Sequence, residues 1–210
     1  MSKFMRKGSK ILAFFVALMM TSFVCIDASF FAVEANAETV ISAEKIVENM
    51  GLGWNLGNSL DSTDDNNTGD QETSWGNPRV TKDLINAVKA KGFNTVRVPI
   101  TWYKSITENN GSYTINADWL ARVKEVVDYA YDNGMYVIIN IHHENWINRV
   151  DLATSYDAMS KELKQVWAQI AEYFSDYDQH LIFEGMNEPR MEGAKKDEWT
   201  GNAACYEVIN

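Results

Sequence analysis

Cysteine is nearly absent from this chain. Of its 210 residues only Cys25 and Cys205 are cysteines. Cys25 lies in an N-terminal segment that we expect to be removed, so the folded protein would hold one cysteine and no internal disulfide. The residues before it, Ser22-Phe23-Val24, match a lipid-attachment motif poorly, and a lipid anchor is not expected. Stability must therefore come from packing of an apolar core.

Positive charge is also scarce. The chain has 19 Lys and Arg residues against 29 Asp and Glu residues, for a formal net charge of −10. Proteins that coat nucleic acid or an anionic membrane use clusters of Lys and Arg, and no such cluster is present. The composition argues against both of these partners and favours a neutral ligand.

No apolar run is long enough for a typical membrane span. The longest, Ile11 to Ile26, falls short of the roughly 20 residues that a spanning helix needs. It is followed by Ala35-Asn36-Ala37, a small-x-small pattern, and preceded by four cations, Lys3, Arg6, Lys7 and Lys10. This order is typical of a signal peptide. We predict a signal peptide at 1–37, cleavage after Ala37 and a secreted, extracellular domain at 38–210; a single membrane anchor is the alternative.

A nucleotide-binding motif is missing as well. Gly51, Gly53 and Gly57 approach a dinucleotide fingerprint, but their spacing is one residue too long. Trp54 stands where a pyrophosphate would have to approach the backbone, and a polar loop follows in place of a helix. No cofactor is expected.

Strand-like apolar runs alternate with helix-like segments along the rest of the chain. The helical segments have apolar residues at three and four spacing and follow Pro78, Asn116 and Asp157. Lys91-Gly92 and Asn133-Gly134 would end the first two. The strand-like runs are 51–57, 93–99, 135–142 and 181–187. This (βα) repeat predicts the α/β class, with a parallel sheet covered by helices.

The polar residues at the strand ends favour one of two α/β architectures. Both a doubly wound open sheet and a (β/α)8 TIM barrel give this alternation. Arg97, His142 and Glu188 each stand at the C-terminal end of a different strand, which is where barrel enzymes gather their catalytic groups. We therefore predict about the first four βα units of a (β/α)8 barrel.

Glu188 is the strongest catalytic candidate. It lies between Asn187 and Pro189, and a residue before proline is disfavoured in the α region, so we expect the chain to stay extended there. A carboxyl group fixed in this way suits a general acid; a solvated acid at a strand end is the alternative. Glu184, four residues earlier on an extended run, would be about 13 Å away, too far to act as its partner carboxylate.

Arg97 and the two adjacent histidines are further candidates. An arginine in an apolar strand needs a carboxylate partner, which is either catalytic or part of a core ion pair. His142 and His143 should point to opposite faces of their strand, which argues against their binding one metal together. We expect no metal, and one histidine facing the cleft.

The remaining features suit a sugar ligand. The acidic loop 61–78 lacks calcium-loop spacing and would carry Trp75 into a cleft. Flat aromatic faces match the apolar faces of sugar rings, although core packing also accounts for many tryptophans. Aromatic residues lie at or just after several strand ends: Trp54, Trp75, Trp102, Tyr103 and Trp146. Together with the acidity, they indicate a neutral polysaccharide.

Five ordered segments from Gly51 onward resemble glycoside hydrolase family 5 of clan A, in particular its secreted bacterial endo-β-1,4-glucanases. They are GLGWNLGNSLD, ETSWGNP, GFNTVRVPITW, VIINIHHENW and FEGMNEPR. The resemblance implies a (β/α)8 barrel and retaining hydrolysis of a β-glucan polysaccharide such as cellulose. By the same resemblance, Glu188 is the acid/base, Asn187 contacts the sugar 2-hydroxyl and Arg97 supports the nucleophile. His142 is the cleft histidine, and Asn55, Trp75 and His143 line the substrate cleft.

The family's nucleophile, a glutamate on the seventh strand, has no counterpart here. We therefore expect an N-terminal fragment of a monomeric catalytic domain, inactive alone. A half-barrel that at most binds glycan is the alternative. Cellulose, mixed-linkage glucan, xyloglucan, xylan and mannan all remain open as substrates of the parent enzyme.

Overall fold

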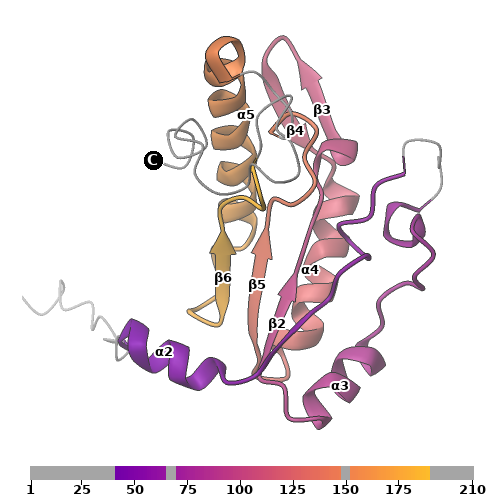
Figure 1. Ribbon diagram of the computed structural model, residues 1–210, viewed down its shortest axis with the longest axis vertical. Coiled ribbons are helices and arrows are strands. Elements are labelled where there is room, and N and C mark those ends of the chain that lie inside the picture. The colour runs from indigo at the N-terminus through magenta and orange to yellow at the C-terminus, as the bar shows by residue number, and fades with distance from the viewer. Residues whose placement is uncertain (1–40, 65–69, 148–151, 190–210) are drawn as a thin grey trace, which may run out of the picture. The chain divides into compact units, whose positions relative to one another are not determined.

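The computed structural model describes residues 41–64, 70–147 and 152–189 (Figure 1). The chain divides into two compact units, Met1–Ser42 and Ala43–Asn210, and every element below belongs to the second. The predicted signal peptide and Cys205 lie outside the described residues. Within those residues, no helix is both long and apolar enough to cross a membrane.

Four parallel strands form the central sheet. They are β1 (Gly53–Asn55), β2 (Thr95–Val98), β5 (Tyr136–Asn140) and β6 (Leu181–Glu184), in the order β1-β2-β5-β6. After β1, each strand of this sheet therefore lies next to the sheet strand that comes before it in the sequence. A doubly wound sheet reverses direction at a switch point, whereas a (β/α)8 barrel adds its strands consecutively. The predicted first four βα units of a barrel are confirmed.

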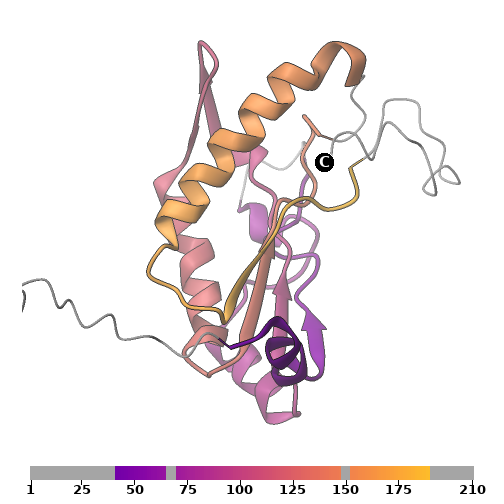
Figure 2. The same cartoon turned by 90° about the vertical axis from the view of Figure 1, so that its left-hand side faces the viewer.

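Helices cover one face of this sheet. They are α3 (Lys82–Ala90), α4 (Ala117–Tyr131) and α5 (Leu152–Tyr173), while a short helix, α2 (Ala43–Met50), precedes β1. Figures 1 and 2 show α4 and α5 running along the same side of the strands. α5 begins before Asp157, the predicted start, and α2 was not predicted.

Capping residues explain where the first two of the covering helices begin and end. The side chain of Thr81 accepts the Leu84 N–H at the start of α3, and that of Asn116 accepts the Asp118 N–H at the start of α4. Gly92 and Gly134 follow these helices with φ of 93° and 65°, a conformation that glycine adopts without a Cβ clash. Both predicted glycine ends are confirmed.

The two faces of the sheet differ in chemistry because side chains alternate along a strand. Val96 and Val98 of β2, with Val137 and Ile139 of β5, are fully buried and belong to the apolar core. The opposite face carries polar residues in register: Asn55 pairs with Arg97, and Asn140 with Glu184. The apolar face is held by the helices, and the polar face is available for a site.

A two-stranded hairpin, which was not predicted, lies between β2 and α4. Strands β3 (Ile106–Asn109) and β4 (Ser112–Ile115) are joined by Asn110-Gly111, both with positive φ. This dipeptide is a strong hairpin signal. The hairpin docks on α5, because the side-chain oxygens of Gln165 and Gln169 accept the N–H groups of Tyr113 and Ile115, each at 3.0 Å.

Candidate active site

The polar face centres on an ion pair between Arg97 of β2 and Glu184 of β6. Arg97 Nε donates to Glu184 Oε2 at 2.7 Å and Nη2 donates to Oε1 at 2.6 Å, a two-pronged contact across β5. The side chains are 27% and 31% exposed, respectively. The prediction that Arg97 needs a carboxylate is confirmed. Within the described residues that carboxylate is Glu184, which sequence reasoning had considered only as a partner for Glu188.

The ion pair fixes the charge of both groups. The hydrogen bonds that Arg97 donates to Glu184 raise the pKa of Arg97 above its ordinary value, with smaller contributions from Asp61 and Glu188. Burial alone would raise the pKa of Glu184, but hydrogen bonds from Arg97 and Asn140 outweigh it and lower that pKa. Glu184 is therefore a carboxylate whose oxygens are already engaged by donors.

Arg97 also organises two of the predicted amides. Its Nη1 donates to Asn55 Oδ1 at 3.0 Å, and its Nη2 donates to Asn187 Oδ1 at 3.1 Å. The Asn187 N–H donates to the Ile141 carbonyl at 2.8 Å, so the chain stays tied to the β5 segment beyond the last residue of β6. Three predicted site residues, Asn55, Arg97 and Asn187, are thus brought together.

Glu188 follows directly and is exposed at the C-terminal edge of the sheet. The expectation of an extended backbone there was wrong, because Glu188 has φ of 44°. The chain turns at this point: Asn187 is held by the Ile141 carbonyl, and β6 has already ended at Glu184. The straight-strand estimate of the Glu184–Glu188 separation consequently does not apply. Glu188 acts electrostatically on Arg97, which associates it with the polar cluster.

His142 and His143 converge, contrary to expectation. Nε2 of each lies 3.8 Å from Asp61 Oδ2, and their rings meet edge-on with centroids 4.3 Å apart. β5 ends at Asn140, two residues earlier than predicted, so strand alternation no longer separates the two side chains. Asp61 is buried, and its Oδ1 accepts the Ser59 N–H at 2.9 Å.

His142 is an uncharged imidazole at neutral pH. Burial, together with the nearby His143 and Arg97, lowers its pKa to about 3. Its Nδ1 lies 2.9 Å from Asn140 Nδ2, and its backbone N–H donates to the Ile100 carbonyl at 2.9 Å. The ring is therefore held through Nδ1, and the backbone of the same residue is fixed by Ile100.

Asp61, His142 and His143 are the group within the described residues whose spacing could suit a metal. Their ligand atoms lie within 4.8 Å of one another, and two imidazoles with a carboxylate are a ligand set that zinc accepts. The donor atoms also suit sugar hydroxyl groups, which accept from N–H and donate to a carboxylate oxygen.

Trp75 lies beside this cluster. Its ring centroid is 5.5 Å from that of His143, its Nε1 donates to the Thr63 carbonyl at 2.7 Å, and 42% of it is exposed. The loop that carries it is tied down by Gln71, whose Nε2 donates to the carbonyls of Leu60 and Thr101. A half-exposed indole on an anchored loop can present a face to a ligand.

The segments after β2 and β5 are joined by Glu144, which sequence reasoning missed. Glu144 is fully buried and accepts the backbone N–H groups of Trp102 at 2.5 Å and Tyr103 at 2.9 Å. It also accepts Trp146 Nε1 at 2.9 Å. Trp102 was expected to suit a sugar ring, but it is fully buried and belongs to the core.

Asn140 and Asp61 were also missed. An amide inside the apolar run VIINI was the available signal for Asn140, because a buried amide requires hydrogen-bond partners. Asp61 was assigned to a solvated loop, and nothing in its local sequence indicates that it would be buried beside two histidines. These positions depend on contacts between segments far apart in the chain.

Comparisons with known proteins agree with this geometry. Residues 60–210 match the model of the cellulase family, glycosyl hydrolase family 5. Endoglucanase A of Ruminococcus albus is 49% identical over 175 residues, which cover 81% of this chain and 47% of that protein. The chain thus spans about half the length of this relative.

Solved structures give the same result. A GH5-4 broad specificity endoglucanase from Ruminococcus flavefaciens superposes with a TM-score of 0.75 at 50% identity, covering 81% of this chain and 48% of that one. A family 5 xyloglucan-specific endo-β-1,4-glucanase from a metagenomic library, in complex with cellotriose, gives a TM-score of 0.73 at 47% identity. It covers 80% of this chain and 49% of its own. The consecutive parallel strands and the polar cluster at their ends agree with these matches. The chain belongs to glycosyl hydrolase family 5, the cellulase family.

Proposed function

We propose that this chain forms one side of the active site of a retaining, endo-acting glycoside hydrolase that cleaves β-1,4-glucans. The observation that carries the proposal is the Arg97–Glu184–Asn187 network, which anchors the residue next to Glu188 at the C-terminal edge of the strands. Family membership supports the reaction class. The activity belongs to the full-length protein that carries this chain.

Glu188 is the proposed general acid and base. In the first step its proton passes to the glycosidic oxygen as the bond from that oxygen to the sugar C1 breaks, while a second carboxylate forms a bond to C1. In the second step Glu188 takes a proton from water, whose oxygen displaces that carboxylate. We propose that the nucleophile is a glutamate outside the described residues, because Glu184 is occupied by Arg97 and Asn140.

The remaining site residues have proposed roles in holding sugar. Asn187 would contact the 2-hydroxyl, Arg97 would help to keep the nucleophile ionised, and His142 would bind sugar in the cleft. Asn55, Trp75 and His143 would line the cleft. Trp75 and His143 contact one another and combine an indole face with a polar ring. This combination suits a neutral glucan chain.

The substrate is proposed to be a cellulose-type β-1,4-glucan. One related structure is described as broad in specificity, and another as xyloglucan-specific with cellotriose bound. We also propose that the protein is exported after removal of residues 1–37 and acts as a monomer. An assay of the full-length protein on cellulose, mixed-linkage glucan, xyloglucan, xylan and mannan would rank its substrates by release of reducing ends.

The decisive experiment is Glu188→Gln in the full-length protein. Glutamine keeps the size of the side chain but has no acidic proton, so hydrolysis of glucan should fall by about 10²- to 10⁴-fold. The first step on an activated aryl β-cellobioside needs little protonation and should be largely spared. Equal losses on both substrates would count against the acid role.

A control separates this effect from general damage. Glu172 is an exposed glutamate of α5, and Glu172→Gln should leave both activities unchanged. If the full-length protein binds cello-oligosaccharides but releases no reducing ends from any of the five polymers, the glycan-binding alternative is correct.

A further inference from the structure

The side chain of Asn140 makes three hydrogen bonds and links the Arg97–Glu184 ion pair to the group formed by Asp61, His142 and His143. It is fully buried at the end of β5. Its Oδ1 accepts the Ile100 N–H at 3.1 Å, while its Nδ2 donates to Glu184 Oε1 at 3.1 Å and lies 2.9 Å from His142 Nδ1. No other described side chain is hydrogen-bonded to both Glu184 and His142.

The orientation of the Asn140 amide is fixed by its partners. A backbone N–H can only donate, so the atom facing Ile100 has to be the amide oxygen. Glu184 is a carboxylate with a lowered pKa and can only accept, so the atom facing it has to be the amide nitrogen. A flipped amide would place oxygen against carboxylate and N–H against N–H, losing both hydrogen bonds.

This orientation determines where the proton of His142 lies. The Asn140 nitrogen offers only hydrogens, so His142 Nδ1 must accept. A neutral imidazole carries one N–H, and that hydrogen is therefore on Nε2. Nε2 is the nitrogen that lies 3.8 Å from Asp61 Oδ2.

We propose that Asn140 is a positioning residue that holds His142 in the Nε2–H tautomer, so that His142 donates a hydrogen bond to a sugar hydroxyl beside Asp61. The role in substrate binding rests on the proposed function, whereas the tautomer does not. In this form Nε2 has no lone pair for a metal, so the cluster of Asp61, His142 and His143 is better suited to a hydroxyl group. Asp61 Oδ2 supplies the matching acceptor.

The tautomer can be read directly by ¹⁵N NMR of the full-length protein labelled at histidine. We expect His142 Nδ1 to have the chemical shift of an unprotonated nitrogen and Nε2 that of a protonated one at neutral pH. His180 is an internal reference of the opposite kind, because its Nδ1 lies 3.0 Å from the Asp178 carboxylate and should carry a hydrogen. A protonated Nδ1 on His142 in the unmodified protein would overturn the proposal.

Asn140→Asp tests the cause of the tautomer. Its carboxylate still accepts from Ile100 but offers no hydrogen to His142 or to Glu184, so Nδ1 should become protonated, as in His180. Glucan kcat/KM should fall by at least about tenfold, because one hydrogen bond accounts for about that factor and the bonds to His142 and Glu184 are both lost. Asn86→Asp is the control, because Asn86 is exposed and its Oδ1 accepts from Asn133. This substitution should change neither the His142 tautomer nor glucan kcat/KM.

The outcomes are distinguishable. A folded Asn140→Asp protein with an unchanged His142 tautomer would refute the positioning role. If this variant does not fold, the spectrum of the unmodified protein decides whether the tautomer is Nε2–H. Absence of glucan hydrolysis by the unmodified protein would reject the proposed function, while the NMR result would still test the tautomer.

Discussion

Arg97 and Glu184 face one another from strands that are not neighbours, and the contact spans β5 with N–O distances of 2.7 and 2.6 Å. The same guanidinium holds Asn55 and Asn187, so one cation connects β1, β2 and the segment after β6. The pair thereby fixes the chain that leads into the proposed acid, at Glu184 and at Asn187. The contacts that position the site residues therefore also stabilise the sheet.

Glu184→Gln should lower the free energy of unfolding by about 2 kcal/mol. Glutamine replaces one accepting oxygen with an NH₂ group that faces the donors of Arg97, and the guanidinium loses its counter-ion while three-quarters buried. Chemical denaturation of the full-length protein measures the change. The matched control is Glu48→Gln, since Glu48 and Lys45 form an exposed pair at 2.8 Å, worth less than about 1 kcal/mol. Equal effects of the two substitutions would show that the Arg97 contact is energetically no different from a surface pair.

Glu144→Gln should loosen the segment after β2. The three N–H groups that point at Glu144 require two accepting oxygens, and glutamine has only one. We expect a loss of about 1–3 kcal/mol in stability, the cost of a buried unsatisfied donor. Hydrogen exchange at the Trp102 and Tyr103 amides should accelerate, whereas exchange in α4 should not. Unchanged protection of both amides would contradict the role of Glu144 as the anchor of this segment.

Strand ends and the residues that follow them were predictable because their signals are local. Arg97 was expected to meet a carboxylate, since a cation in an apolar strand is costly alone, yet choosing Glu184 required the register between strands. His142 and His143 were wrongly separated because the end of β5 was placed two residues late, and strand alternation holds only within the strand. The Asn110-Gly111 signal for the hairpin was present and was overlooked.

Residues that act across the chain were not predictable from their neighbours. Glu144 looks like an ordinary acid after two histidines, and only folding brings it to the N–H groups of Trp102 and Tyr103. Glu72 likewise lies in an acidic loop that was expected to be solvated, but it is fully buried. In both cases burial depends on segments that are tens of residues apart.

Glu72 forms ion pairs with buried Arg122 and with exposed Arg79. Glu72→Gln should lower the free energy of unfolding more than a substitution of the exposed member, Arg79. Glu72 accepts from Arg122 Nε at 2.9 Å, from Arg122 Nη2 at 2.8 Å and from the Val80 N–H at 2.6 Å. Breaking a buried ion pair costs about 3–5 kcal/mol, and we expect the lower end of this range because Arg122 keeps its contact with Glu125 at 2.5 Å. The control is Arg79→Gln, since Arg79 is 54% exposed and lies 3.6 Å from Glu72. Chemical denaturation measures the free energy of unfolding of both variants. An equal loss for Arg79→Gln and Glu72→Gln would refute the prediction.

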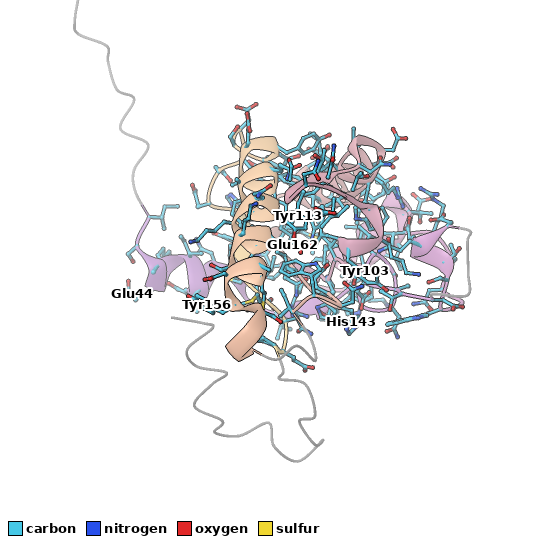
Figure 3. The ribbon with its side chains drawn as sticks, turned by 90° about the horizontal axis from the view of Figure 1, so that it is seen from above. Glu44, Tyr103, Tyr113, His143, Tyr156 and Glu162 are labelled. Atoms are coloured by element: carbon cyan, nitrogen blue, oxygen red, sulfur yellow. The ribbon has the colours of Figure 1, made fainter. Side chains whose placement is uncertain are left out.

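Docking of the β3–β4 hairpin on α5 should weaken as the pH rises. Glu162 of α5 lies beside Tyr113 of β4 (Figure 3), and burial followed by repulsion from Glu108 raises its pKa to about 7. The folded-state pKa is above the ordinary value of 4.5, so the folded protein binds the extra proton between these two pH values. The stabilisation is therefore complete below about pH 4.5 and is lost as the pH rises through about 7.

Glu162→Gln tests this directly, because glutamine resembles the protonated acid and does not titrate. The variant should be more stable than the unmodified protein at pH 8 by about 1 kcal/mol, and the two should have similar stability at pH 4.5. Glu172→Gln on the exposed side of α5 should show no such pH-dependent difference. Thermal unfolding across this pH range gives the comparison. A constant difference between Glu162→Gln and the unmodified protein at every pH would mean that Glu162 is not the group whose ionisation weakens the hairpin contact.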